Sequence, residues 1–266
     1  MAKHVGSVSH EQELSVVEHL DELRTRLITV IAAFAVALGV AFWQNHRILE
    51  IINRPLPDGK IPATFGVSEA FMSTMTVSMY AALVVTLPLI IWHFYAFVIP
   101  AFSEQERKVA TPLLVMTPFL FLAGVAFGFF LVLPAAVHFL LNFNDDQFNV
   151  LVRAREYYSF FGLTVVSMGL LFELPLAILI AARLGFVTPA QLRSNRRYAL
   201  VIVAILAMLL PGTDPVSMLI EMVPLVLLYE ISILVCVWFG RSGARAAEAR
   251  QAPSGPQSAE PPAAVR

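Results

Sequence analysis

Long stretches without charge constrain this chain more than any other feature of its sequence. Four stretches lack Asp, Glu, Lys and Arg entirely: 20 residues between Arg26 and Arg47, 34 between Glu69 and Glu104, 36 between Lys108 and Asp145, and 16 between Arg197 and Asp214. Two further stretches, residues 157–182 and 215–240, are interrupted only by acidic residues. An ionised group costs several kcal/mol at the centre of a bilayer, so these six stretches predict six transmembrane helices.

The composition agrees with a membrane protein and excludes several other classes. Of the 266 residues, 58% are hydrophobic and 14% are charged, against about 25% charged residues in a soluble domain. The formal net charge of -1 leaves no basic excess for a nucleic-acid backbone. The single cysteine, Cys236, can form no intramolecular disulfide and no cysteine-based metal site. We therefore predict an all-α polytopic membrane protein without a cofactor, a metal or a nucleic-acid partner.

The lengths of the predicted spans differ. The second and third exceed the roughly 20 residues that cross a bilayer, so they must tilt, bend or protrude. Prolines at positions 88, 112, 118 and 134 are expected to supply bends. The fifth span is shorter than a bilayer crossing, so either the bilayer should thin beside it or the sixth span should be recessed with it, which gives two short C-terminal spans.

The distribution of Lys and Arg over alternate loops predicts the orientation. The side that carries both termini has 13 of these residues and the other side has five. By the positive-inside rule both termini are cytoplasmic, in a multi-pass protein of the cell membrane. No small-residue cleavage motif follows the first span, so it is expected to be a retained signal anchor.

Three segments are predicted along the chain. Residues 1–24 form a cytoplasmic segment with an amphipathic helix, for which Ser15 and Glu18 match a capping box. Residues 25–240 form the six-helix transmembrane domain. Residues 241–266 are rich in Ala, Pro, Ser and charge, and are expected to be a disordered cytoplasmic tail.

A family resemblance appears in the residues just before the first span. The run at residues 19–27, HLDELRTRL, resembles the H-L-x-E-L-R-x-R-L signature of the TatC family, the multi-spanning subunit of the twin-arginine protein translocase. Further matches cover about residues 14–240: NRPL at 53–56, AFVIPAF at 96–102, EQER at 104–107, FELP at 172–175, LPGTD at 210–214, Pro224, and YE at 229–230.

The resemblance implies a function and a set of partners. A TatC-like protein is a concave six-helix bundle that binds twin-arginine signal peptides of folded precursors and serves as the core scaffold of a Sec-independent translocase. It is not an enzyme, and the proton-motive force drives transport. The expected partners are single-span subunits of the TatA and TatB types, further copies in a larger receptor complex, and membrane lipid.

The resemblance also assigns a signal-peptide site on the cytoplasmic side. A guanidinium is a planar fork suited to a carboxylate, so two adjacent arginines need at least two acids. Glu22 and Glu106 match the family's glutamates. Arg24 is expected to hold Glu22 or a lipid phosphate in place. Phe97 and Pro100 are expected to form an apolar floor, with an interfacial anchor as the alternative for Phe97.

Acidic residues within the spans are the remaining candidates. Glu173 lies deep in the fourth span, where the family has a polar membrane site that contacts the single-span subunits, and Glu230 is either a second such residue or a structural ion-pair partner. Glu221 is expected to reach the outer interface. In the outer loops, Pro55 is expected to fix a turn and Asp214 to cap the sixth helix, and both match functional positions in the family.

A second class of function is compatible with the composition. A small-solute secondary transporter could use Glu173, Glu221 and Glu230 as a path for a coupling ion. Catalytic motifs of metalloproteases, serine hydrolases and P-loop ATPases are absent from the sequence. The translocase prediction requires partners and cytoplasmic acids, whereas the transporter would act alone.

Overall fold

The computed structural model describes residues 10–57, 60–98, 104–144, 146–147, 150–183, 186–210 and 215–251. Nearly all of these residues are helical, and one isolated bridge joins Ala63 to Arg153. The elements in chain order are α1 (His10–Trp43), α2 (Asn45–Ile52), α3 (Glu69–Val98), α4 (Glu104–Phe127), the π-helical turn η2 (Gly128–Val132), α5 (Leu133–Asn142), α6 (Ala154–Leu171), α7 (Leu174–Arg183), α8 (Pro189–Ser194), α9 (Arg196–Leu209) and α10 (Pro215–Gln251).

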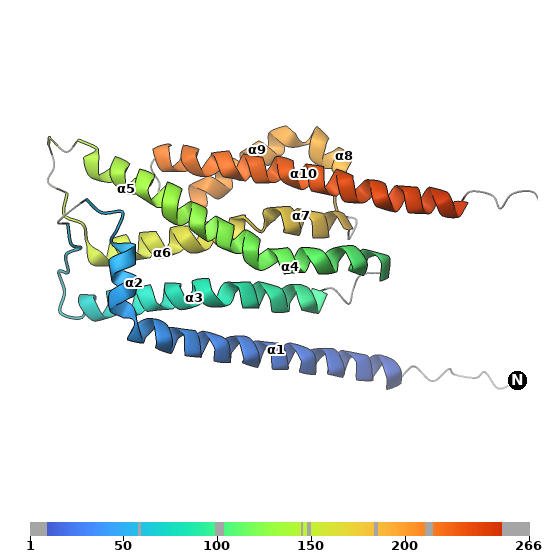
Figure 1. The fold of residues 1–266 in the computed structure, drawn as a ribbon, viewed down its shortest axis with the longest axis horizontal. Helices are drawn as coiled ribbons and strands as arrows, with labels where there is room; N and C mark the ends of the chain where they lie inside the picture. Colours follow the sequence, from blue (N-terminus) through green and yellow to red (C-terminus); the bar gives the residue numbers. More distant parts are fainter. Residues whose placement is uncertain are drawn as a thin grey trace, which may run out of the picture.

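Within the described residues, the chain passes along the length of the molecule in α1, in α3, in α4 to α5, in α6 to α7, in α9 and in α10, which makes six passes (Figure 1). The pass in α9 has 14 residues, about 21 Å at 1.5 Å per residue. The fifth pass is thus as short as the sequence predicted, and its crossing of a bilayer stays a prediction. The other five contain helices long and apolar enough to cross: Leu20–Trp43, Glu69–Phe97, Val115–Asn142, Ala154–Ala182 and Pro215–Val237.

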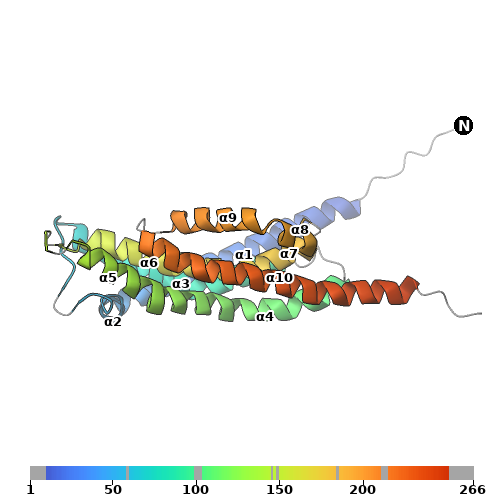
Figure 2. The ribbon, with the colours of Figure 1, turned by 90° about the horizontal axis from the view of Figure 1, so that it is seen from above.

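Successive passes alternate in direction, which gives the molecule two distinct ends. The beginning of α1, the end of α3, the beginning of α4, the end of α7, α8 and the end of α10 lie together at one end, here the termini end (Figure 1). Residues 53–57 and 60–68, the end of α5 and the beginning of α6 lie at the opposite end, here the cap end. In Figure 2, α9 and the first half of α1 rise on the same side of α3 and α6, so the bundle is concave on that side.

Both predicted terminal segments differ from expectation. α1 is one continuous helix from His10, so no separate helix starts at a Ser15 cap. Residues 10–20 contain Glu, Gln and Leu without Gly or Pro, and such residues let a helix propagate. α10 continues to Gln251, so the tail is helical beyond residue 240, because Ala, Arg and Glu dominate residues 244–250. Residues 252–266 lie outside the described part.

Glycines allow α4 and α6 to approach closely in the core. A Cβ built at Gly124 of α4 would lie 2.5 Å from the carbonyl oxygen of Met168 on α6. A Cβ at Gly169 of α6 would lie 2.5 Å from the ring of Phe121 on α4. The two helices therefore meet through backbone surface. Beyond this contact, η2 precedes Pro134, at one of the predicted bends.

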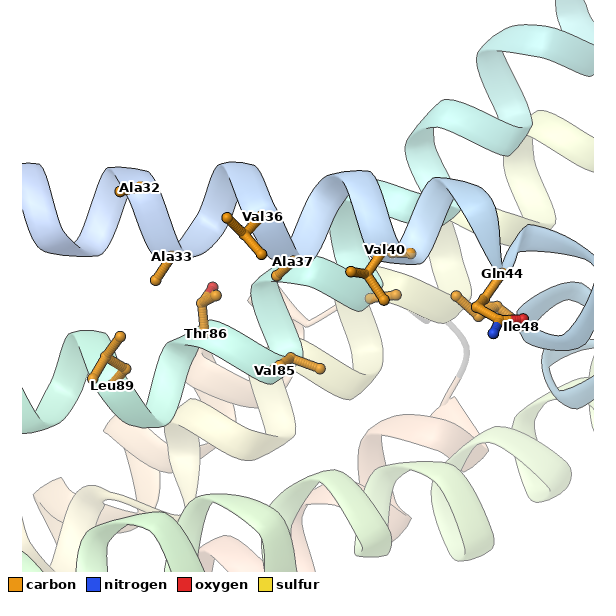
Figure 3. Close-up of a pocket in the computed structure, with 12 residues that line it drawn as sticks. Ala32, Ala33, Val36, Ala37, Val40, Gln44, Ile48, Val85, Thr86 and Leu89 are labelled. Atoms are coloured by element: carbon orange, nitrogen blue, oxygen red, sulfur yellow. The ribbon is translucent and has the colours of Figure 1, made fainter.

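α1 packs along α3 and leaves an apolar groove between them. The groove has a volume of about 700 Å³. Small and branched apolar side chains of both helices line it, with Gln44 at one end (Figure 3). In a bilayer such a surface faces hydrocarbon at no cost, since lipid tails are as apolar as the side chains.

Candidate functional site

The first predicted site lies at the termini end, where α1 and α3 lie side by side. Nε of Arg26 donates a hydrogen bond of 3.0 Å to Oε1 of Glu22, one turn earlier on α1. Nη1 of the same guanidinium lies 3.3 Å from Nδ1 of His93 on α3. The side chains of Arg26 and Glu22 are 24% and 41% exposed. Arg26 therefore connects a partly exposed carboxylate on α1 to a ring on α3.

The partner of Glu22 is a correction to the sequence analysis, which gave this role to Arg24. Residues four apart lie on one helix face, whereas residues two apart point to different faces, so Arg26 is the arginine that reaches Glu22. Arg24 is exposed, and the ion pairs found within the described residues do not include it. Its predicted contact with lipid phosphate stays a prediction.

The other members of the predicted site are placed to different degrees. Phe97 lies on α3, one turn beyond His93, and is half-buried. Glu106 belongs to the first turn of α4, which begins at the termini end (Figure 1), and its side chain is outside the described part. Pro100 also lies outside the described residues. The meeting of the Glu22 and Glu106 carboxylates stays a prediction.

Glu173 occupies the break between α6 and α7. Pro175 has no N–H to bond the carbonyl of Leu171, so the helix cannot continue regularly through this point. The chain tightens there, with the amide of Glu173 donating to the carbonyl of Leu170 at 3.1 Å. α7 then begins at Leu174, with the proline in its first turn, where a missing N–H is tolerated.

The side chain of Glu173 points into the bundle. It is 6% exposed, and within the described residues neither carboxylate oxygen has a hydrogen-bond partner. Tyr95 of α3 lies within electrostatic range of it. The sequence predicted an acid deep within this span, and the structure adds that its side chain is buried. A buried, unpartnered carboxylate is costly, which marks this position as a candidate for function.

The two other acids of the last span have different environments. Glu230 accepts a hydrogen bond of 2.7 Å from Arg196 of α9 and is 40% exposed, as the structural alternative for this residue predicted. The expectation for Glu221 was wrong, because its side chain is fully buried and does not reach an interface. The burial of Glu221 depends on which face of α10 packs inward. The sequence could not predict this face, because apolar residues lie on every side of the membrane part of α10.

Pro55 lies in a turn at the cap end, after α2. The amide of Leu56 donates to the carbonyl of Asn53 at 3.0 Å, so the proline stands inside the turn that the sequence predicted. The hydroxyl of Tyr157 on α6 donates a hydrogen bond of 2.6 Å to the carbonyl of Ile52. Asp214, the second predicted outer residue, is outside the described part.

The rest of the cap end is joined to the start of α6. The amide of Ala63 donates to the carbonyl of Val152, and the amide of Ala154 donates to the carbonyl of Ala63, both at 2.8 Å. Nε of Arg153 donates to Oε1 of Glu69 at 2.8 Å, and this bond raises the pKa of the Arg153 guanidinium above its ordinary value. These contacts hold the segment before α3 against the start of α6.

Sequence reasoning missed His93, Tyr157 and the pair of Arg153 with Glu69. Each of these contacts joins residues far apart in the chain, so spacing along one helix carries no signal for it. A histidine within an apolar span was the one available indication for His93.

Comparison with known proteins identifies relatives over most of the chain. The sequence profile of a family described as Sec-independent protein translocase protein (TatC) matches residues 18–224. The TatC protein of Desulforapulum autotrophicum is 33% identical over 239 residues, which are 88% of this chain and 88% of that protein. The TatC protein of Carboxydothermus hydrogenoformans is 34% identical over 227 residues, which are 85% of this chain and 93% of that one.

A solved structure resembles the fold as well. The crystal structure of the twin-arginine translocase receptor TatC in DDM superposes with a TM-score of 0.72 at 32% sequence identity. The superposition covers 82% of this chain and 99% of the other.

Proposed function

This chain belongs to the TatC family of Sec-independent protein translocase proteins, and we propose that it is a twin-arginine signal-peptide receptor. In this role it is also the core scaffold of a translocase that exports folded proteins across the cytoplasmic membrane. The observation that carries the proposal is the match, in sequence and in fold, to a solved twin-arginine translocase receptor over 99% of that structure's chain.

The receptor site is proposed at the termini end. Glu22 and Glu106 each accept one guanidinium of the arginine pair, since a carboxylate and a guanidinium form two parallel hydrogen bonds. Phe97 and Pro100 contact the hydrophobic residues that follow the pair in a signal peptide. Arg24, which is exposed on α1, supports the site from the lipid side.

Contacts with the single-span TatA-type and TatB-type subunits are proposed along the membrane face. Glu173 offers a hydrogen-bond acceptor there, and since its side chain is buried, the helix break at residues 172–173 must move to present it. Glu230 contributes on α10, beside the start of α9. Pro55 and Asp214 act in the outer loops, where the contacts with α6 support a fixed shape.

Orientation and energy source complete the proposal. The 13 Lys and Arg residues assigned to the termini side support a cytoplasmic location for the termini end. The proton-motive force supplies the energy, and further copies of the chain join in a larger receptor complex. A solute transporter would need Glu230 in its ion path, and this residue is instead held in a surface ion pair with Arg196.

The test is photocrosslinking of the membrane-embedded protein to a twin-arginine signal peptide. Glu22→Gln and Glu106→Gln are expected to weaken crosslinking about 10- to 100-fold, because each loses a charge-assisted bidentate pair of about 1.5–3 kcal/mol. A twin-lysine peptide should show a similar loss.

Glu50→Gln is the matched control, because Glu50 is an exposed glutamate on α2 at the cap end. It should leave crosslinking unchanged. Absence of crosslinking in the unmodified protein, or equal crosslinking in all three variants, would contradict the proposed receptor role. Uptake of a small solute by the purified protein alone would favour a transporter.

A further inference from the structure

The carboxylate proposed to receive a signal arginine already binds an arginine of its own chain. The Nε atom and one terminal nitrogen of Arg26 donate to the same oxygen of Glu22, and the other terminal nitrogen is directed to His93. An incoming guanidinium would need the same type of hydrogen bonds from the same carboxylate. Arg26 is therefore chemically a stand-in for the ligand.

We propose that Arg26 is an internal competitor of the signal peptide. It occupies Glu22 in the unliganded receptor, and it is retained by His93 when a peptide arginine takes the carboxylate. This inference rests on the proposed receptor function and adds a competing group and a positioning residue to that site.

The chemistry of the contact with His93 supports this exchange. A guanidinium has five N–H donors and no acceptor, so Nδ1 of His93 must be the acceptor. The contact of 3.3 Å thus requires the neutral imidazole, with its proton on Nε2. Because this acceptor lies on α3, Arg26 keeps a hydrogen bond when it leaves Glu22 on α1.

The exposure of the pair lowers the free energy needed to replace Arg26 on Glu22 by a peptide arginine. The side chains of Arg26 and Glu22 are partly exposed, at 24% and 41%. For an exposed Glu–Arg pair at this spacing, the equilibrium constant between the paired and the unpaired side chains is about two. A competitor of that strength lowers the affinity for every ligand of Glu22 about threefold. It leaves the ratio of affinities for arginine and lysine peptides unchanged, since the same factor applies to both.

The experiment measures binding of a fluorescent twin-arginine peptide to the full chain in lipid nanodiscs. Arg26→Gln is expected to raise affinity about threefold relative to Arg193→Gln, which removes the same charge from an exposed position on α8 at the termini end, outside the proposed site. A lysine–arginine peptide should gain by the same factor. Equal or lower affinity for Arg26→Gln, or a changed ratio between the two peptides, would overturn the competitor role.

His93→Leu separates positioning from a structural role. While Arg26 is bound to Glu22 its contact with His93 is 3.3 Å, longer than the usual range of about 2.7–3.2 Å, and it can shorten once Arg26 leaves, so His93 favours the released arginine. Without this acceptor, peptide affinity should fall in the unmodified background and stay constant in the Arg26→Gln background. The same fall in both backgrounds would overturn the assignment of His93.

Failure of this inference is distinct from failure of the receptor role. If the unmodified protein binds no peptide, or if Glu22→Gln has no effect on binding, the receptor function itself is wrong. If Glu22→Gln weakens binding while Arg26→Gln matches Arg193→Gln, only the competitor role is wrong.

Discussion

Gly124→Ala should loosen the contact between α4 and α6 that holds the helix break at Glu173. The added methyl group would lie 2.5 Å from the carbonyl oxygen of Met168 and 2.8 Å from Cβ of Phe172. Ordinary contacts of a Cβ begin near 3.4 Å, so the helices must separate by roughly 0.9 Å. The nearest obstacle is backbone, which cannot turn aside as a flexible side chain could.

The size of the effect follows from two opposing terms. Overpacking a well-packed core costs about 1–3 kcal/mol, and a contact against backbone belongs at the upper end of that range. Replacing glycine by alanine within a helix gains about 1 kcal/mol. The net loss is about 2 kcal/mol of unfolding free energy, which lowers the thermal midpoint of a chain of this size by about 4–8 °C.

Thermal unfolding in detergent, followed by circular dichroism, measures this loss. Gly39→Ala is the matched control, because a Cβ at Gly39 of α1 would meet nothing within 4 Å. This variant should keep or raise the midpoint through helix propensity alone. A midpoint for Gly124→Ala equal to or above that of the unmodified protein would refute the close approach of the two helices.

Two further substitutions test the cap end and the buried acid. Tyr157→Phe should cost about 1–2 kcal/mol of unfolding free energy, since it leaves the buried carbonyl of Ile52 without its donor. Tyr198→Phe, at an exposed tyrosine, should change the midpoint little, and equal effects of the two would exclude a stabilising role for the Tyr157 hydroxyl. Glu173→Gln should leave the midpoint unchanged or higher, because no hydrogen bond within the described residues is lost. It should reduce site-specific crosslinking to single-span subunits, and a large drop in midpoint would show instead that Glu173 is structural.

Much of the fold follows from charge alone, because hydrocarbon penalises every ionised group regardless of which helices pack together. The six stretches of low charge predicted the passes, and Pro175 accounts for the break beside Glu173 once the structure is seen. The pairing of Arg26 followed from helical spacing and could have been derived. The contact with His93 could not, because it depends on how α1 lies along α3, and no pattern within either helix encodes that.

Burial misled the sequence analysis at Glu221 for a related reason. α10 has apolar residues all round, so its sequence does not distinguish the face that meets α7 and α9 from the face that meets lipid. The sequence analysis inferred the exposure of Glu221 from its distance to the end of the helix. The exposure is in fact determined by the neighbouring helices. The same argument explains why the depth of Glu173 could be predicted but its inward direction could not.

The carboxylates of the membrane domain differ in their hydrogen-bond partners. Glu22, Glu69 and Glu230 each accept a hydrogen bond from an arginine. Glu69 begins α3, Glu22 lies near the start of the first candidate span, and the partner of Glu230 begins α9, so these pairs lie toward the ends of passes, where water and lipid head groups reduce the cost of charge. Glu173 lies within a pass, its oxygens without a hydrogen-bond partner among the described residues. Stability alone would favour an apolar residue at such a position. The carboxylate of Glu173 thus stands beside a break in the helix, an arrangement that suits the proposed acceptor for a donor from outside the chain.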